Sequence, residues 1–485
     1  MKHVFCSAII VFLLFVDILL AITFGWVRQA FGGVSMEELI FHLKVPLQGT
    51  DISSFVSFFR GALLPSIGIF ALMMAVWGRM RREKRQGINH RIRWKRIVVG
   101  IWVVECVVMG HYFSMGKYFY NQITATSWLE DNAIQPDEAL LMWPEKKRNL
   151  IYIMMESMEA SFASKRDGGM YDVGLTPELT EMAKNNLSFS DQKDTLGGAF
   201  PIDGATWTMG AMFAQTSGLP LKLGIELNSM DQYSAFFPGV TTLGDLLERA
   251  GYHNILMIGS DATFGGRRNY FTQHGNYEIN DYVWAKENGK IPKNYSVFWG
   301  FEDRRLIEMV KEKLLEVSEE DVPFNLTMLT VDSHFPDGYR CGLCEKTYDT
   351  DYKDAIACSS RQIAQLVAWI QQQDFYANTT VIVTGDHLSM SAEMEKELGG
   401  YSHRRVYNCF LNAAAAPVKT QERVFTAMDM FPTTLAALGV QIEGDRLGIG
   451  TNLFGTRQTL AEELGFETYE QEISRHSRFF DSLAY

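Results

Sequence analysis

The chain is poor in cysteine, and only one pair of its six cysteines has the Cys-x-x-Cys spacing. That pair is Cys341 and Cys344, and no second pair follows that would complete a zinc site built from two of them. Alone, the pair suits redox chemistry or half of a zinc site. Cys6 and Cys106 fall in apolar stretches near the amino end. If the later part of the chain is exported, we expect a disulfide between Cys358 and either Cys344 or Cys341.

The amino end lacks a clear small-x-small cleavage site, which argues against a removed signal peptide. Three apolar stretches follow one another there, at residues 4–27, 56–77 and 97–115. Each is close to the roughly 20 residues that a membrane-spanning helix needs. The sequence therefore predicts a membrane domain over residues 1–116 with three transmembrane helices.

Basic residues are fewer than acidic ones, 45 against 57, but one segment, residues 79–96, holds nine Lys or Arg and a single acidic residue, Glu83. A nucleic-acid patch is the alternative interpretation, but a position between two predicted spans favours a cytoplasmic loop. We therefore expect no nucleic-acid partner. The same rule places the amino terminus inside and everything after Met115 outside, so the protein is predicted to be a multi-pass membrane protein with an extracytoplasmic catalytic domain.

The remainder of the chain is strongly acidic. The total charge is −12 and the basic segment carries +8, which leaves −20 elsewhere. Such a domain would repel an anionic substrate unless a bound cation offset the charge locally. The composition thus favours a metal site over a phosphate site made of Arg and Lys alone.

Strand and helix patterns alternate after a juxtamembrane linker at residues 117–147. Apolar runs at residues 150–155, 254–258, 324–331 and 381–383 predict buried strands, and residues 242–250 and 352–372 have helical patterns. This order predicts an α/β fold over residues 148–485, with a mostly parallel sheet sandwiched by helices.

Polar side chains follow four of these strands directly: Glu156, Asp261, His334 and the pair Asp386-His387. In a parallel sheet such residues gather at the carboxyl edge, where α/β proteins bind ligands. Carboxylate oxygens and imidazole nitrogen are suitable metal ligands. A turn cap and an ordinary loop histidine are the alternatives for Asp386 and His387.

The segment Gly204-Ala-Thr-Trp-Thr-Met-Gly210 predicts a tight turn before a helix that starts near Trp207. Thr206 would then lie at a helix amino end, which favours an anion. Metal coordination can activate a threonine hydroxyl as a nucleophile. Thr206 as a plain N-cap is one alternative, and Thr208 as the nucleophile is another.

Taken together, the motifs NLIYIMMES, GATWT, DSHFPDG, TGDH and DMFPTTLAALG resemble those of the phosphoglycerol transferase and lipoteichoic acid synthase family of the alkaline phosphatase–sulfatase superfamily. The segment MEELIFHLKVPLQGT also resembles the stretch between spans in that family. The resemblance implies one divalent ion, usually manganese, with magnesium or zinc as alternatives. It also implies roles for individual residues: metal ligands Glu156, Thr206, Asp386 and His387; nucleophile Thr206; phosphoglycerol contacts Arg267, His334 and Ser391.

The reaction implied is transfer of glycerol phosphate from phosphatidylglycerol, a membrane lipid, through a phospho-threonine intermediate to a glycan or polyglycerolphosphate acceptor. Phosphoethanolamine transfer is the nearest alternative. The sequence lacks a C/S-x-P-x-R motif at the expected segment, which argues against a sulfatase, and only His403 remains as an extra ligand for a two-metal phosphodiesterase. A non-catalytic membrane scaffold is a further alternative.

Two departures from the family pattern concern the substrate contact. The lipoteichoic acid synthases have a tryptophan two positions before the substrate arginine, where this chain has Gly265. Arg268 adjoins Arg267, and the sequence does not distinguish which of the two points inward.

Overall fold

The computed structural model describes residues 2–30, 34, 36–44, 48, 50, 52–85, 94–222 and 236–484. The described chain forms two compact units. The first comprises Met1–Met36 and Asp51–Tyr120, and the second comprises Glu37–Thr50 and Asn121–Tyr485. The predicted linker therefore groups mostly with the second unit, as does the segment between the first two apolar stretches.

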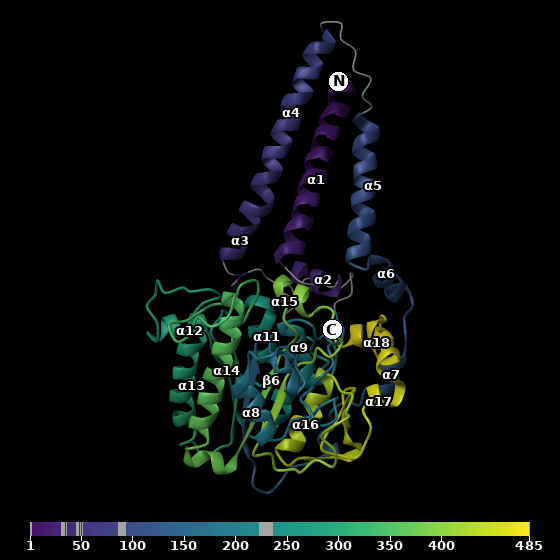
Figure 1. Ribbon diagram of the computed structural model, residues 1–485. Helices are drawn as coiled ribbons and strands as arrows, with labels where there is room; N and C mark the ends of the chain where they lie inside the picture. The colour runs from purple at the N-terminus through teal and green to yellow at the C-terminus, as the bar shows by residue number, and fades with distance from the viewer. Residues whose placement is uncertain are drawn as a thin grey trace. The chain divides into compact units, whose positions relative to one another are not determined.

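Long apolar helices make up the first unit (Figure 1). Two segments are long and apolar enough to cross a membrane, Val11–Ala30 and Phe55–Arg79. A third span exists only if Val99–Tyr112 and Met115–Ile123, bent by 69° at their junction, count as one. The structure thus supports two or three spans, and the predicted count of three is not confirmed. Residues 86–93 of the basic segment lie outside the described residues. The helices are α1 (Lys2–Ala30), α3 (Ile52–Phe58), η1 (Phe59–Leu63), α4 (Leu64–Arg85), α5 (Trp94–Tyr112) and α6 (Met115–Ile123).

A six-stranded sheet organises the second unit, in the order β4-β3-β5-β2-β6-β7. Five strands are parallel, and the edge strand β7 runs antiparallel to β6. The mostly parallel sheet is as predicted, whereas β4 and the antiparallel β7 were not predicted. The strands are β2 (Asn149–Met155), β3 (His253–Ile258), β4 (Glu278–Asn280), β5 (Phe324–Leu329), β6 (Thr379–Gly385) and β7 (Asn408–Leu411).

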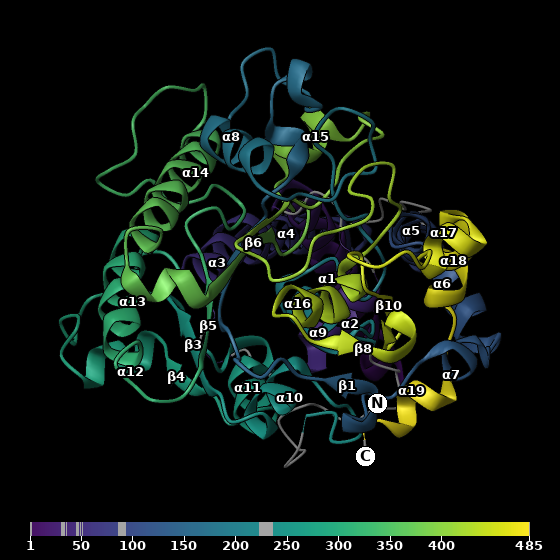
Figure 2. The ribbon, with the colours of Figure 1, turned by 90° about the horizontal axis from the view of Figure 1, so that it is seen from below.

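Successive side chains of the central strand β2 point to opposite faces of the sheet. Because these side chains are apolar, both faces need a cover, and helices lie on each of them. Leu150, Tyr152 and Met154 of β2 pack into one apolar core. Ile151 and Ile153 pack into the other. Figure 2 shows α8, α13 and α14 on one side of β6, and α9 and α16 on the other. Both cores are apolar, which explains why the strands have continuous rather than alternating hydrophobic runs.

Helix starts agree closely with the predicted ones. Thr242 accepts a hydrogen bond from Asp245 N at the start of α10, and Thr350 caps α14 in the same way. The helices and short strands of this unit are α2 (Met36–Lys44), α7 (Trp128–Asn132), β1 (Leu141–Met142), α8 (Pro177–Asn185), α9 (Thr208–Ser217), α10 (Leu243–Arg249), α11 (Arg267–Gln273), α12 (Tyr282–Glu287), α13 (Asp303–Val317), α14 (Asp351–Ile370), α15 (Ala392–Leu398), α16 (Met430–Ala437), β8 (Gln441–Ile442), β9 (Arg446–Leu447), β10 (Gly450–Thr451), α17 (Leu460–Leu464), α18 (Phe466–Ser474) and α19 (Arg478–Ser482).

Candidate metal centre and active site

The adjacent central strands β2 and β6 bring three of the predicted ligands together. Met155 pairs with Gly385 at the ends of these strands, so the next residues, Glu156 and Asp386, emerge side by side. Glu156, Asp386 and His387 are all buried, and each offers a ligand atom within 4.8 Å of the others. We call these three residues the carboxylate–imidazole cluster.

His387 lies at the centre of this cluster. Its Nε2 is 3.3 Å from Asp386 Oδ2 and 3.5 Å from Glu156 Oε1. Its Nδ1 lies 2.7 Å from the carbonyl oxygen of Leu388. Since a carbonyl only accepts, Nδ1 carries the hydrogen, and the lone pair of the neutral ring lies on Nε2, facing the carboxylates. This is the tautomer that a metal-binding histidine requires.

Backbone and side-chain donors hold the two carboxylates in place. Ser157 donates from its backbone N to Asp386 Oδ1 at 2.8 Å and from its hydroxyl to Glu156 Oε1 at 2.8 Å. The backbone N of His387 also donates to Asp386 Oδ1, at 2.7 Å. Ser157 has φ 54°, a left-handed conformation that is uncommon outside glycine and that turns the chain sharply after β2. Ser157 was not among the predicted site residues.

Thr208, rather than the predicted Thr206, has its hydroxyl against the cluster. Thr208 Oγ1 lies 3.2 Å from Glu156 Oε2 and 3.3 Å from His387 Nε2. Helix α9 begins at Thr208 with Trp207 as its N-cap, one residue later than expected, so Thr208 occupies the helix amino end. Within the described chain, no hydrogen bond joins Thr206 to Glu156, Asp386 or His387. The preference for Thr206 depended on where the helix begins, and the sequence fixes helix ends only to within a residue or two.

Burial and charge shift the pKa values of the cluster in different directions. Burial would raise the pKa of Glu156, but His334, His387 and nearby donors together lower it below the usual value. Burial and the Glu156 charge raise the pKa of Asp386 to about 7. Burial would lower the pKa of His387, but the two carboxylates raise it. When no cation is present, the raised pKa values of Asp386 and His387 therefore make both groups bind protons more readily near neutral pH.

His334 lies near the same edge, after β5. Its Nδ1 is 2.8 Å from the carbonyl oxygen of Phe335, which leaves Nε2 available. Burial lowers the pKa of His334, with the Glu156 carboxylate acting in the opposite direction. The indole of Trp299 lies against this ring, with centroids 4.6 Å apart, and Trp299 also contacts Phe264. A tryptophan is thus present beside the predicted substrate histidine, although it comes from a part of the chain that the sequence did not indicate.

The structure distinguishes the two neighbouring arginines at the start of α11. Arg268 forms an ion pair with Asp281 and faces that carboxylate. Arg267 is buried, donates to Ser260 Oγ at 3.3 Å and to the Asp261 carbonyl at 3.1 Å, and has a buried Nε without a partner. Burial lowers the pKa of Arg267 to about 10, opposed first by the Glu156 charge. Arg267 is therefore the inward residue, with a donor left for an anion.

The remaining predicted contacts are less direct. Ser391 is buried as the N-cap of α15, and its backbone N donates to Ser389 Oγ at 3.3 Å. The described contacts do not join Ser391 to the carboxylate–imidazole cluster. Asp261, a carboxylate that follows β3, accepts a hydrogen bond from Thr263 N at 2.8 Å and thus stabilises the turn in which it lies. His403 is exposed, with Nδ1 3.1 Å from Gln192 Nε2.

A buried ion pair supports the loop after β6. Arg404 binds Glu159 through Nε at 3.0 Å and Nη2 at 2.6 Å, and it also donates to the Ser389 carbonyl at 3.1 Å. Glu159 in turn accepts from Ser389 N at 2.8 Å. The pair fixes the chain between His387 and Ser391. No local sequence signal indicated it, because the two charged residues are far apart in the chain.

The residues present fit a divalent cation. Asp386 Oδ2 is buried without a hydrogen-bond partner, and His387 Nε2 presents its lone pair toward the same point. Two carboxylates and one imidazole form a mostly oxygen donor set, which suits manganese, magnesium or zinc. In the described part of the chain the other group of metal-binding type consists of three cysteines, so a second oxygen-ligand centre is not indicated there.

The fold and this cluster together define an α/β protein with a candidate cation site at the carboxyl edge of a mostly parallel sheet. The family model described as Sulfatase matches residues 148–440, and the chain belongs to that family. Solved structures agree on the fold. A protein in the alkaline phosphatase superfamily from Vibrio parahaemolyticus superposes with a TM-score of 0.51 at 22% identity, covering 68% of this chain and 77% of that one.

Two further structures have comparable folds. The lipoteichoic acid synthase LtaP from Listeria monocytogenes gives a TM-score of 0.50 at 16% identity, covering 68% of this chain and 82% of its own. The integral membrane protein lipooligosaccharide phosphoethanolamine transferase A (EptA) from Neisseria meningitidis gives 0.52 at 13% identity, covering 91% of this chain and 87% of its own.

Among sequence relatives, phosphoglycerol transferase I from Xanthomonas axonopodis pv. citri (strain 306) is 28% identical over 437 residues. The match covers 88% of this chain but 59% of that relative. The phosphoglycerol transferase I of Escherichia coli O127:H6 (strain E2348/69 / EPEC) is 27% identical over 390 residues, covering 76% of this chain and 47% of its own. The chain thus spans about half to three fifths of the length of these relatives.

Proposed function

We propose that this protein is a membrane phosphoglycerol transferase that moves glycerol phosphate from phosphatidylglycerol to an extracytoplasmic acceptor through a covalent intermediate on Thr208. The observation that carries the proposal is the Thr208 hydroxyl, which lies within hydrogen-bonding distance of both Glu156 and His387 at the amino end of α9. The names of the sequence relatives support the choice of glycerol phosphate as the transferred group.

Each residue has a role that follows from its position. Thr208 Oγ1 releases its proton to solvent and attacks phosphorus, and the P–O bond to diacylglycerol breaks. His334 acts here in its protonated form: with its Nδ1 hydrogen held by the Phe335 carbonyl, it hydrogen-bonds the phosphoryl group through Nε2 or donates the Nε2 proton to the leaving oxygen. Arg267 binds the anion with the donor it has left. An acceptor hydroxyl then gives its proton to the neutral His334 ring or to solvent and attacks the phospho-threonine, and the P–O bond to Thr208 breaks, so that Thr208 is regenerated with a proton from solvent.

Glu156, Asp386 and His387 would hold the cation, with Thr208 completing the donor set. Manganese is our first choice, with magnesium or zinc as alternatives. When bound, the ion lowers the pKa of the threonine hydroxyl and neutralises charge on the phosphoryl oxygens. The low pKa of Glu156 keeps one carboxylate ionised beside Thr208 for this purpose.

The two or three apolar helices support a membrane protein, and we place the catalytic unit on the extracytoplasmic side because of the basic segment at residues 79–96. There it would meet both the lipid donor and a glycan or polyglycerolphosphate acceptor.

Mass spectrometry tests the intermediate directly. Full-length protein in detergent is incubated with phosphatidylglycerol and Mn²⁺ and then digested, and a glycerophosphate adduct is expected on the peptide that contains Thr208. The Thr208→Ala variant should give no adduct, whereas Thr206→Ala should retain it.

Other outcomes would change the assignment. An adduct formed only with phosphatidylethanolamine would indicate a phosphoethanolamine transferase. Release of glycerol phosphate to water, with two ions bound per cluster, would indicate a phosphodiesterase. Absence of any adduct in the metal-loaded protein, together with full lipid turnover by Thr208→Ala, would refute covalent transfer through this residue.

A further inference from the structure

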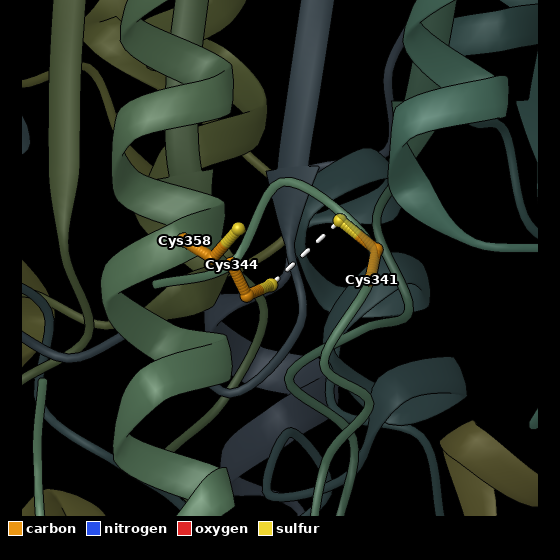
Figure 3. Close-up of side chains that lie close together, drawn as sticks. All are labelled: Cys341, Cys344 and Cys358. Carbon is orange, nitrogen blue, oxygen red and sulfur yellow. Dashed lines mark hydrogen bonds between the residues drawn. The ribbon is translucent and has the colours of Figure 1, made fainter. Parts of the chain in front are cut away.

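Three cysteines outside the candidate active site converge on one point. Cys341 and Cys344 lie on the connection between β5 and α14, and Cys358 lies on α14 (Figure 3). Their sulfur atoms all lie within 4.8 Å of one another. We call Cys341, Cys344 and Cys358 the thiol cluster. The sequence had suggested a disulfide here, but all three are free thiols in the structure.

The spacing of the sulfur atoms matches metal coordination. Cys341 Sγ and Cys344 Sγ are 3.7 Å apart. Three thiolates around one tetrahedral zinc, with Zn–S of about 2.3 Å, have sulfur atoms about 3.8 Å apart. A disulfide would bring two of the sulfur atoms to about 2.05 Å and leave the third thiol unused. The third cysteine is therefore better explained by a metal site than by a disulfide.

N–H groups point at the sulfur atoms, as expected where thiolates need stabilisation. The backbone N of Leu343 donates to Cys341 Sγ at 3.4 Å. The buried Gln362 directs its amide nitrogen to Cys358 Sγ at 3.4 Å and to Cys341 Sγ at 3.8 Å. Its Oε1 is buried without a partner, so the amide has an unused oxygen next to the sulfur atoms.

A positively charged side chain, Arg361, lies close to the thiol cluster, and it is also 3.8 Å from the Glu345 carboxylate. Arg361 Nη2 lies 4.0 Å from Cys358 Sγ and also donates to the Leu343 carbonyl at 3.0 Å. Three thiolates around a cation of charge +1 or +2 leave a net negative group, which Arg361 offsets. Cys344 is only half-buried, whereas Cys341 and Cys358 are buried, so Cys344 is the most accessible of the three thiols.

We propose that the thiol cluster is a second metal site, in which Cys341, Cys344 and Cys358 bind one thiophilic ion, Zn²⁺ or Cu⁺. Gln362 donates N–H hydrogen bonds to two of the three thiolates, those of Cys341 and Cys358. Thiolates select these soft ions over the manganese or magnesium suited to carboxylates. The site would fasten the β5–α14 connection to α14. That connection begins with the segment containing His334, so the second ion has a structural role near the substrate-binding edge.

Metal analysis of the full-length protein provides the test. Protein purified in detergent without chelator is analysed for zinc and copper, and one equivalent of either is expected in addition to any ion of the carboxylate–imidazole cluster. Which of the two elements is found identifies the ion. Cys341→Ser and Cys358→Ser should each lose that equivalent. Cys409→Ser is the matched control, because Cys409 is a buried free thiol on β7 outside the cluster, and it should retain the ion.

Cobalt binding gives an absorption signal that is specific for thiolate ligands, so neither misfolded protein nor cobalt bound at the oxygen-ligand site would produce it. Co²⁺ added to metal-stripped protein should give thiolate-to-cobalt charge-transfer absorption in the wild type and in Cys409→Ser, but not in Cys358→Ser. The proposal is overturned if the wild type contains no zinc or copper and two of the three thiols resist alkylation until a reductant is added, since that result shows a disulfide. It is equally overturned if all three thiols are free and bind neither ion.

Discussion

The carboxylate–imidazole cluster and the thiol cluster belong to the same unit but are built differently. The first consists of residues that directly follow two adjacent, hydrogen-bonded strands, so the register of the sheet sets its geometry. The second joins a long connection to a helix, and its geometry depends on how that connection folds back. Backbone pairing fixes strand ends closely, whereas a loop must be held by its side chains.

The two clusters also differ in chemistry. Oxygen and imidazole ligands favour hard or borderline ions that polarise a phosphoryl group, whereas thiolates favour soft ions that cross-link the chain. One protein can thus keep a catalytic and a structural ion apart by ligand type. The following predictions, ordered from the largest expected effect to the smallest, test this division.

Thr208→Ala should abolish transfer, with kcat/KM reduced by at least about 10³-fold, because the variant lacks the nucleophile. Thr206→Ala should reduce it by less than about tenfold, since the hydroxyl of Thr206 does not contact the cluster. Initial rates of diacylglycerol release from phosphatidylglycerol measure both. A larger loss for Thr206→Ala than for Thr208→Ala would reverse the assignment. Zinc or copper content should be unchanged in either variant.

Asp386→Asn should weaken manganese binding by at least about 100-fold, because it replaces a charged ligand by a neutral amide in a buried site. The thiol cluster should keep its ion in this variant. Titration with Mn²⁺ followed by electron paramagnetic resonance measures the first effect, and elemental analysis measures the second. Loss of both ions together would show that the clusters are not independent.

Gln362→Leu should weaken the binding of the thiophilic ion by about 10- to 100-fold. The substitution removes the N–H donors that face Cys341 and Cys358 while preserving side-chain volume. Competition with a chromophoric chelator measures the affinity. Gln362→Glu also lacks these N–H donors and adds a negative charge beside the thiolates, so it should bind the ion no better than Gln362→Leu. Equal affinity of wild type and Gln362→Leu would exclude a role for this amide.

The smallest effect concerns a buried carboxyl pair, Asp303 at the start of α13 and Asp332 on the connection that follows β5. Burial raises the pKa of Asp303 to about 7, and burial together with the Asp303 charge raises that of Asp332. The folded pair therefore holds a proton that the unfolded chain releases above pH 4. Stability should fall as pH rises from about 5 to 7, by up to about 1.4 kcal/mol per pH unit.

Asp332→Asn should make this dependence less steep without removing it, because the amide is uncharged at every pH, its oxygen can still accept from Asp303 N, as Asp332 Oδ1 does at 3.2 Å, and the raised pKa of Asp386 remains. Unfolding temperatures from pH 5 to 8 provide the measurement. The control is Asp172→Asn, which changes an exposed carboxylate paired with Lys165 and should leave the slope unchanged. Parallel profiles for wild type and Asp332→Asn would contradict the assignment of the proton to this pair.

Much of the sheet and part of the candidate site could be predicted because both are local in sequence. Continuous apolar runs identified β2, β3, β5 and β6, and the polar residues directly after them included Glu156, Asp386 and His387. Edge strands were missed because β4 is only three residues long and β7 has no distinctive pattern. Short strands are stabilised by their neighbours rather than by their own sequence.

The amino-acid sequence by itself determined the apolar helices, four of the five parallel strands and the ligand types of both clusters. The tertiary structure decided which side chains meet: Thr208 rather than Thr206, Arg267 rather than Arg268, Trp299 beside His334, and three thiols rather than a disulfide. The physical reason is that a one-residue shift of a helix start turns a different side chain toward the site by about 100°. Contacts between distant segments depend on packing that no local pattern contains.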